Sequence, residues 1–209
     1  MVSGLYSLVQ TLKGKRFAVL GPAAAGKTTM INFLRTGEVT LHYEETEAPT
    51  KLKGRNIKLK EYELKIDDIV DVPGDKDFHS TWKMQVSTAD VVCYIFDASR
   101  FVRGDISYID LVMSEMRHVS EWRKDRAREH SVLRFFVIGT HLDLVLDYRD
   151  ADQLGKSSYV SAIWKTPIFE KLSRISGGSA ARCLAGSLSD QTGCEHLVGR
   201  VISEVAAAE

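Results

Sequence analysis

One glycine-rich segment, flanked by two apolar runs, limits the folds open to this chain more than any other feature. Residues 21–28 read G-P-A-A-A-G-K-T, which matches the pattern G-x-x-x-x-G-K-[ST] at every fixed position. The apolar run 16–20 before it predicts a buried strand, and residues 29–34 after it predict a helix. In this context the loop surrounds a phosphate with backbone N–H groups at the helix N-terminus, with Lys27 on the outer phosphates and Thr28 on Mg²⁺. The loop residues expected to contact the phosphates are Ala23, Ala24, Ala25, Gly26, Lys27, Thr28 and Thr29.

The size and composition are those of one globular domain. The chain has 209 residues, 44% of them hydrophobic and 27% charged, which is enough to bury a substantial core. Its 28 basic and 28 acidic residues cancel, which disfavours nucleic acid or an anionic membrane surface as a partner. The three cysteines (Cys93, Cys183 and Cys194) have no metal-binding spacing, and we find neither a membrane-spanning apolar run nor a signal peptide. We therefore expect a cytoplasmic protein with reduced thiols.

Residues 1–14 predict a short amphipathic helix ahead of the main domain. Apolar side chains recur there at steps of three to four residues, namely at Val2, Leu5, Leu8, Val9 and Leu12. Gly14 ends the pattern. We therefore expect residues 15–209 to form one domain around the phosphate-binding loop 21–28, called the P-loop below.

Apolar runs alternate with helical patterns along the rest of the chain. Strands are expected at 16–20, 51–60, 62–70, 91–96, 132–138 and 180–185. Helices are expected after the P-loop, from Asp105 as cap to 129, and at 159–164, 168–175 and 192–208, whereas 144–157 is expected to be irregular. This order predicts an α/β fold with a doubly wound, mostly parallel six-stranded sheet and one antiparallel edge strand. Nucleotide sites in such sheets lie at the carboxyl ends of the strands.

Three further motifs follow expected strands. Residues 71–74 read D-V-P-G, residues 140–143 read T-H-L-D, and residues 186–188 read G-S-L ahead of the last helix. A dication between phosphates takes oxygen ligands, and a carboxylate at a strand end close to the P-loop supplies one. Asp71 is therefore a candidate magnesium ligand.

Together these motifs resemble, in order and spacing, those of the small GTPases of the Ras superfamily, over nearly the whole chain. The loop ending A-A-G-K-T, the run L-R-T-G-E at 34–38 and the pair Pro49-Thr50 resemble the Arf-like branch in particular. The resemblance implies a switch that binds and hydrolyses GTP with Mg²⁺ and cycles between GDP and GTP states. Two loops, at 38–50 and 73–87, would change between those states.

The resemblance also implies the phosphate-side roles. Thr28, Thr50 and Asp71 would hold Mg²⁺. Thr50 and the Gly74 N–H would meet the γ-phosphate only in the GTP state, so its loss would free both loops.

On the base side, the resemblance implies that Asp143 accepts hydrogen bonds from guanine N1–H and the exocyclic amine. Adenine offers neither donor in that arrangement. Thr140 stands where the family accepts Asn or Thr, and His141 replaces the usual Lys whose stem lies along the base. Ser187 and Leu188 resemble the element whose backbone amide contacts guanine O6.

Asp75 is the largest departure from the family pattern. It stands where Ras-like and Arf-like enzymes carry a Gln that orients the attacking water, and an ionised Asp has no donor and adds negative charge beside the phosphate. Slow intrinsic hydrolysis is expected, with a catalytic set of Lys27, Thr50, Gly74 and Asp75. A nucleotide-binding scaffold (pseudo-GTPase) with negligible turnover is the alternative, and an ATP-dependent kinase or ATPase is disfavoured by Asp143.

The expected partners are effector and regulatory proteins that contact the two switch loops. For the N-terminal helix the resemblance leaves two roles, insertion into a membrane in the GTP state or permanent packing. Val2 stands where Arf proteins carry an acylated Gly, so any membrane contact through this helix should be weak, and we favour packing.

Overall fold

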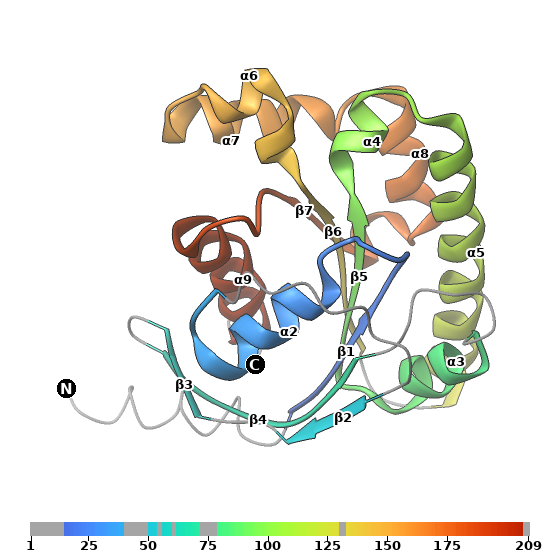
Figure 1. Ribbon diagram of the computed structural model, residues 1–209. Coiled ribbons are helices and arrows are strands. Elements are labelled where there is room, and N and C mark those ends of the chain that lie inside the picture. Colours follow the sequence, from blue (N-terminus) through green and yellow to red (C-terminus); the bar gives the residue numbers. More distant parts are fainter. Residues whose placement is uncertain are drawn as a thin grey trace.

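The computed structural model describes residues 15–39, 50–53, 56–59, 62–71, 79–129 and 133–206. These residues form a central sheet with helices on both faces (Figure 1). The expected N-terminal helix at 1–14 lies outside them, as do residues 40–49 and the segment 72–78 with Gly74 and Asp75.

Within the described residues the strand order is β2-β4-β1-β5-β6-β7, and β3 pairs with β4. The strands are β1 (Lys15–Leu20), β2 (Thr50–Lys53), β3 (Asn56–Leu59), β4 (Tyr62–Asp71), β5 (Val91–Asp97), β6 (Arg134–Thr140) and β7 (Arg182–Ala185). The neighbours from β4 through β7 run parallel, and β2 is antiparallel to β4 at the edge. The predicted fold class is confirmed.

Strands β2 and β3 both lie in the stretch 51–60 that was predicted as a strand, apart from Thr50 at the start of β2, and both pair antiparallel with β4. β2 pairs with residues 68–71 of β4 and β3 with residues 62–65, in one continuous register. Residues 54 and 55 between them lie outside the described residues. Six strands form the main path of the sheet, and β3 extends the pairing along β4.

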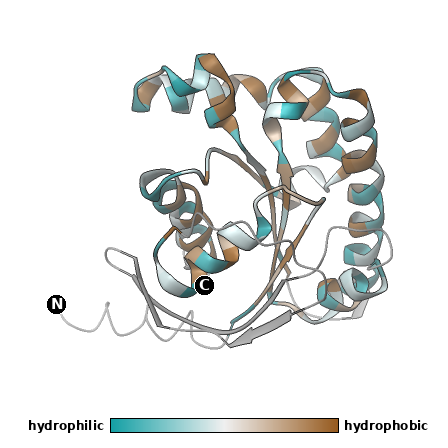
Figure 2. Cartoon of the chain, viewed as in Figure 1, coloured by the Kyte–Doolittle hydropathy of each residue, from teal (hydrophilic) through white to brown (hydrophobic). Residues whose placement is uncertain are grey.

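Helices α2 (Lys27–Thr36) and α9 (Gln191–Ala206) cover one face of the sheet, and α3 (His79–Thr88), α5 (Ile106–Glu129) and α8 (Pro167–Ile175) cover the other (Figure 1). Successive side chains of a strand point to opposite faces. Accordingly Phe17 and Val19 of β1 join one buried apolar cluster, while Ala18 and Leu20 join the other. Covering on both faces explains the unbroken apolar runs in the sequence, which Figure 2 shows as brown strands at the centre. No helix in the described part of the chain is long and apolar enough to cross a membrane.

Three short helices lie where the sequence predicted none. They are α4 (Ala98–Val102), α6 (Leu146–Arg149) and the first half of α7 (Gln153–Ile163). Asp152 caps α7, because its Oδ1 accepts a hydrogen bond of 2.7 Å from the Gly155 N–H. The expectation of irregular chain over 144–157 was therefore wrong. Leu146 and Leu154 are 61% and 76% exposed, so no core-facing apolar period marks these helices.

Candidate functional site

The P-loop joins β1 to α2 as expected, and its glycines are required by its geometry. Gly21 has φ +139°, and a Cβ there would lie 1.9 Å from the carbonyl oxygen of Ile95 in β5. Gly26 (φ +92°) and Ala24 (φ +57°) are both left-handed. Left-handed residues within such a loop turn backbone N–H groups inward around an anion. Ala23 and Ala24 are exposed at the crest of the loop, whereas Ala25 is buried.

Lys27 spans this loop. Its Nζ donates a hydrogen bond of 2.8 Å to the Pro22 carbonyl, and the residue is only 7% exposed. This bond holds the side chain across the loop. Thr28 and Thr29 follow in the first turn of α2, both half-buried.

Thr140, at the end of β6, ties the P-loop to the sheet. Its Oγ1 lies 2.8 Å from the Ala25 carbonyl oxygen and 3.0 Å from that of Phe96, and the residue is fully buried. The hydroxyl has one proton, which these two carbonyl acceptors share, and His141 Nδ1 lies 2.8 Å from the same oxygen. Thr140 therefore acts on this site by holding the P-loop.

Asp143 and Ser187 meet where the loops after β6 and β7 converge. Ser187 Oγ donates to Asp143 Oδ1 at 2.5 Å and accepts the Ser189 N–H at 3.0 Å. The two loops are also joined through the backbone, since the Leu142 N–H donates to the Gly186 carbonyl. Asp143 itself lies in a single turn of 3-10 helix (Leu142–Leu144).

His141 and Leu188 approach the P-loop from these same two loops. A Cβ placed on Gly26 would lie 3.3 Å from Leu188 Cδ1, 3.8 Å from Thr140 Cγ2 and 3.9 Å from His141 Cε1. His141, directly after β6, has φ +59°, a left-handed conformation that is uncommon outside glycine. The structure thus brings together the P-loop, the T-H-L-D segment and the G-S-L segment, as their order along the strands predicted.

Two predicted magnesium ligands occupy facing positions in the sheet. Thr50 begins β2 and pairs with Asp71, the last residue of β4. Asp71 also pairs with Val19 of β1, two residues before the P-loop begins. The backbone register therefore places both positions next to the strand that leads into the P-loop.

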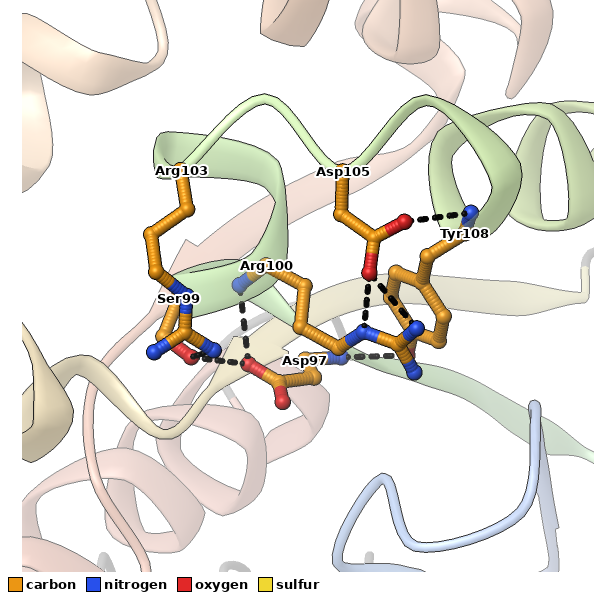
Figure 3. A network of polar contacts seen from close by, with 6 residues as sticks. All are labelled: Asp97, Ser99, Arg100, Arg103, Asp105 and Tyr108. Atoms are coloured by element: carbon orange, nitrogen blue, oxygen red, sulfur yellow. Dashed lines mark hydrogen bonds and ion pairs between the residues drawn. The ribbon is translucent and has the colours of Figure 1, made fainter.

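Sequence reasoning missed a polar network after β5, drawn in Figure 3. The Asp97 N–H donates to Tyr108 Oη at 2.8 Å, and Asp97 Oδ1 accepts from Ser99 Oγ and the Arg100 N–H. Arg100 Nε and Nη2 donate to Asp105 Oδ2 at 2.8 and 2.6 Å. The hydrogen bonds from Arg100 and then from the Tyr108 N–H lower the pKa of Asp105, whereas burial raises the pKa of Tyr108. The network fixes the short helix α4 and the start of α5 at the end of β5, the strand against which Gly21 packs.

Gln191, at the start of α9, makes a second connection that the sequence did not reveal. Its Nε2 donates to the Gly37 carbonyl at 2.9 Å, and its Oε1 accepts the Val39 N–H at 3.2 Å. The remaining amide hydrogen bonds to Glu195 Oε1 at 3.0 Å. A residue four positions after Ser187 thereby holds the chain that leads from α2 toward the predicted first switch.

Comparison with known proteins gives both a family and a fold. Residues 1–126 match the ADP-ribosylation factor (Arf) family. A search of curated proteins finds no match. The chain is similar to the solved Arl6 BBS3 small GTPase from Trypanosoma brucei with bound nucleotide analogue GppNp, at TM-score 0.64 and 19% identity, covering 93% of this chain and 98% of that one. It is also similar to a chain of the signal recognition particle receptor SRb-GTP/SRX complex from Chaetomium thermophilum, at TM-score 0.61 and 16% identity, again with 93% and 98% covered.

The family match covers more than half of the chain and includes the P-loop, Thr50 and Asp71. Both structures share the fold over nearly the full length of the two chains compared. The loops after β1, β6 and β7 converge at one end of the sheet, as the resemblance to small GTPases implied. The protein therefore belongs to the ADP-ribosylation factor family of small GTPases.

Proposed function

We propose that this protein is a molecular switch that binds guanine nucleotide, hydrolyses GTP slowly and signals through its two switch loops. The observation that carries the proposal is the convergence of the P-loop with the two base-side loops, through the Thr140–Ala25 and Asp143–Ser187 hydrogen bonds. Members of the Arf family generally bind guanine nucleotide and hydrolyse GTP, which supports the same conclusion. A cytoplasmic location and effectors that contact 38–50 and 73–87 are part of the proposal.

The phosphate side has the donors that the proposal needs. The left-handed residues of the P-loop turn backbone N–H groups toward an anion, and Lys27 lies across the loop to meet its outer phosphates. The Thr28 hydroxyl, with Thr50 and Asp71 at facing strand positions, fits the all-oxygen ligand set of Mg²⁺. When bound, the ion would neutralise phosphate charge.

On the base side, Asp143 would accept the N1–H and exocyclic amine of guanine. Ser187 donates to only one of its oxygens, which leaves acceptor capacity on the carboxylate. His141 would cover one side of the base, and the Leu188 N–H would reach O6. Thr140 would contribute by keeping the P-loop against these loops.

Identifying the nucleotide that the purified protein carries tests the proposal at once. We expect GDP or GTP after heat denaturation and chromatography of the supernatant. ADP or ATP in stoichiometric amount would contradict guanine recognition.

The second candidate is a guanine-nucleotide-binding scaffold with negligible turnover, favoured by Asp75 and His141 at two positions where the family pattern differs. Release of phosphate with Mg²⁺ separates the two. GTP-dependent release of one equivalent or more per protein supports the switch, and release far below one equivalent supports the scaffold.

Replacing Asp75 with Gln should raise the rate of GTP hydrolysis by about tenfold, equal to about 1.4 kcal/mol of barrier. A Gln both accepts and donates hydrogen bonds to the attacking water, and it removes a negative charge beside the phosphate. Single-turnover hydrolysis of preloaded GTP measures the chemical step, and Asp75→Asn serves as the control that removes charge without restoring reach. A large fall in rate for Asp75→Gln would make Asp75 a water-positioning base instead.

Replacing Gln191 with Ala should accelerate GDP dissociation by about fivefold, because each lost hydrogen bond to Gly37 and Val39 contributes about 0.5–1.5 kcal/mol. The change frees the chain entering the first switch from the loop that holds Ser187. Release of a fluorescent GDP analogue measures the rate, and Glu195→Ala is the matched control, since it removes only the third contact of the amide. A lower melting temperature with an unchanged dissociation rate would show that Gln191 stabilises the fold without affecting nucleotide release.

A further inference from the structure

The hydroxyl of Thr140 has more hydrogen-bonding partners around it than it has protons. Its Oγ1 lies 2.8 Å from the Ala25 carbonyl oxygen, 3.0 Å from the Phe96 carbonyl oxygen and 2.8 Å from His141 Nδ1. The residue is fully buried, so bulk water does not reach the hydroxyl. A hydroxyl carries one donor and two acceptor lone pairs. The role of the imidazole nitrogen therefore decides how much of the single proton is left for the two carbonyls.

The protonation state of the His141 ring sets that role. In a neutral ring with its proton on Nε2, Nδ1 is an acceptor and competes with the carbonyls for the Thr140 proton. In a protonated ring both nitrogens are donors, so Nδ1 donates to the hydroxyl oxygen and the Thr140 proton goes to the carbonyls. Imidazole is the side chain whose charge ordinarily changes near neutral pH. This group of contacts can therefore respond to pH.

The Ala25 carbonyl links these contacts to the phosphate-binding loop. Ala25 is buried in the P-loop and directly precedes Gly26, whose φ is +92°. A hydrogen bond that holds this carbonyl also holds the left-handed backbone next to it, which turns N–H groups toward an anion. The His141 ring is half-buried, so it can exchange protons with solvent. The ring thus connects the solvent to the shape of the P-loop.

The segments around the ring carry ionisable groups of both signs. They are Lys27 after the P-loop, Asp97, Arg100 and Arg103 after β5, Asp143 on the same turn as the ring, and Asp190 after β7. The three carboxylates and three cations cancel formally, whereas the phosphates of a bound nucleotide add negative charge. That charge alone would also favour a protonated ring in the bound state. A test must therefore separate the Thr140 hydrogen bond from the charge of the ring.

We propose that His141 is a positioning residue whose protonation, acting through the Thr140 hydroxyl, holds the P-loop and slows nucleotide release at low pH. The inference rests on the proposed nucleotide switch and adds proton control of release to it. Because the bound state favours the protonated ring, release is slowest at low pH and becomes faster as the ring loses its proton. One hydrogen bond is involved, and a neutral ring can also carry its proton on Nδ1, so the expected change in rate is about fivefold.

Dissociation of a fluorescent GDP analogue from the full-length protein, measured from about pH 5.5 to about pH 8, tests the proposal. The parent protein should release the analogue about fivefold more slowly at the acid end of this range. His141→Gln should lose the dependence on pH, because an amide does not titrate there. His196→Gln is the matched control, since His196 is exposed on α9, and it should keep the profile of the parent.

Two changes at Thr140 separate its hydroxyl from the charge of the ring. Thr140→Val removes the hydroxyl and should give fast release at every pH, whereas Thr140→Ser keeps the hydroxyl and should restore the dependence on pH. A parent-like profile in His141→Gln or in Thr140→Val would overturn the proposal. Circular dichroism at each pH checks the fold, and His141→Gln decides alone if Thr140→Val does not fold. GDP release that does not change with pH in the parent would refute the role of His141 and leave the switch standing. Absence of GDP binding at every pH would refute both.

Discussion

Asp143→Asn is expected to lower the affinity for GTP by at least about a hundredfold and to raise the relative affinity for xanthosine triphosphate. Sites built around a hydrogen-bonded substrate group reject analogues that cannot make the bond by about 10⁴–10⁵-fold, and a single reversed pair should reach part of that range. The carboxylate accepts two guanine donors, whereas an Asn amide donates to the carbonyl that xanthine carries in place of the amine. Ser187 Oγ can donate or accept, so the amide side chain of this variant keeps its partner in the loop.

Titration of both proteins with GTP, xanthosine triphosphate and ATP measures this change. Asp147→Asn is the matched control, because Asp147 is exposed on α6 and its replacement removes the same charge. Unchanged GTP affinity in Asp143→Asn would mean that the T-H-L-D segment does not read the base.

Lys27→Ala is expected to lower the affinity for GTP and GDP by at least about a hundredfold. Hydrogen bonds to charged groups contribute about 1.5–3 kcal/mol each, and the ammonium would donate to more than one phosphate oxygen. The substitution also removes the hydrogen bond from Nζ to the Pro22 carbonyl. The backbone N–H groups of the P-loop then lose a contact that holds the loop in shape. Isothermal titration measures the affinity, circular dichroism checks the fold, and replacement of the exposed Lys171 of α8 by Ala is the control. GTP binding equal to that of the parent protein would contradict the assignment of the P-loop as the phosphate-binding site.

Much of the fold could be predicted because local pattern and global arrangement agree. The apolar runs at β1, β5 and β6 are long because both faces of the sheet are covered. The P-loop motif itself predicts a strand before it and a helix after it. The convergence of Asp143, Ser187 and Gly26 followed from their places at the carboxyl ends of parallel strands. None of this required knowledge of side-chain contacts.

The parts that could not be predicted depend on contacts between distant residues or on exposed apolar side chains. Gln191 reaches Gly37 across 154 positions of the chain, and no motif marks such a pair. Thr140 was predicted only as a position of the T-H-L-D motif, and the sequence did not reveal that its buried hydroxyl bonds to the carbonyls of Ala25 and Phe96. The sequence did not predict α6 or the first half of α7, because Leu146 and Leu154 are exposed to solvent and mark no core-facing side of a helix.

Direct titration with GDP and ADP, in the presence of Mg²⁺, tests the central claim that the converging loops form a guanine-nucleotide site. The protein is first stripped of bound nucleotide, and both affinities are measured on the same preparation by calorimetry. The account predicts that GDP binds at least about a thousandfold more tightly than ADP, because the Asp143 carboxylate finds two donors on guanine and none in that arrangement on adenine. Equal affinity for GDP and ADP, or no binding of either, would contradict it.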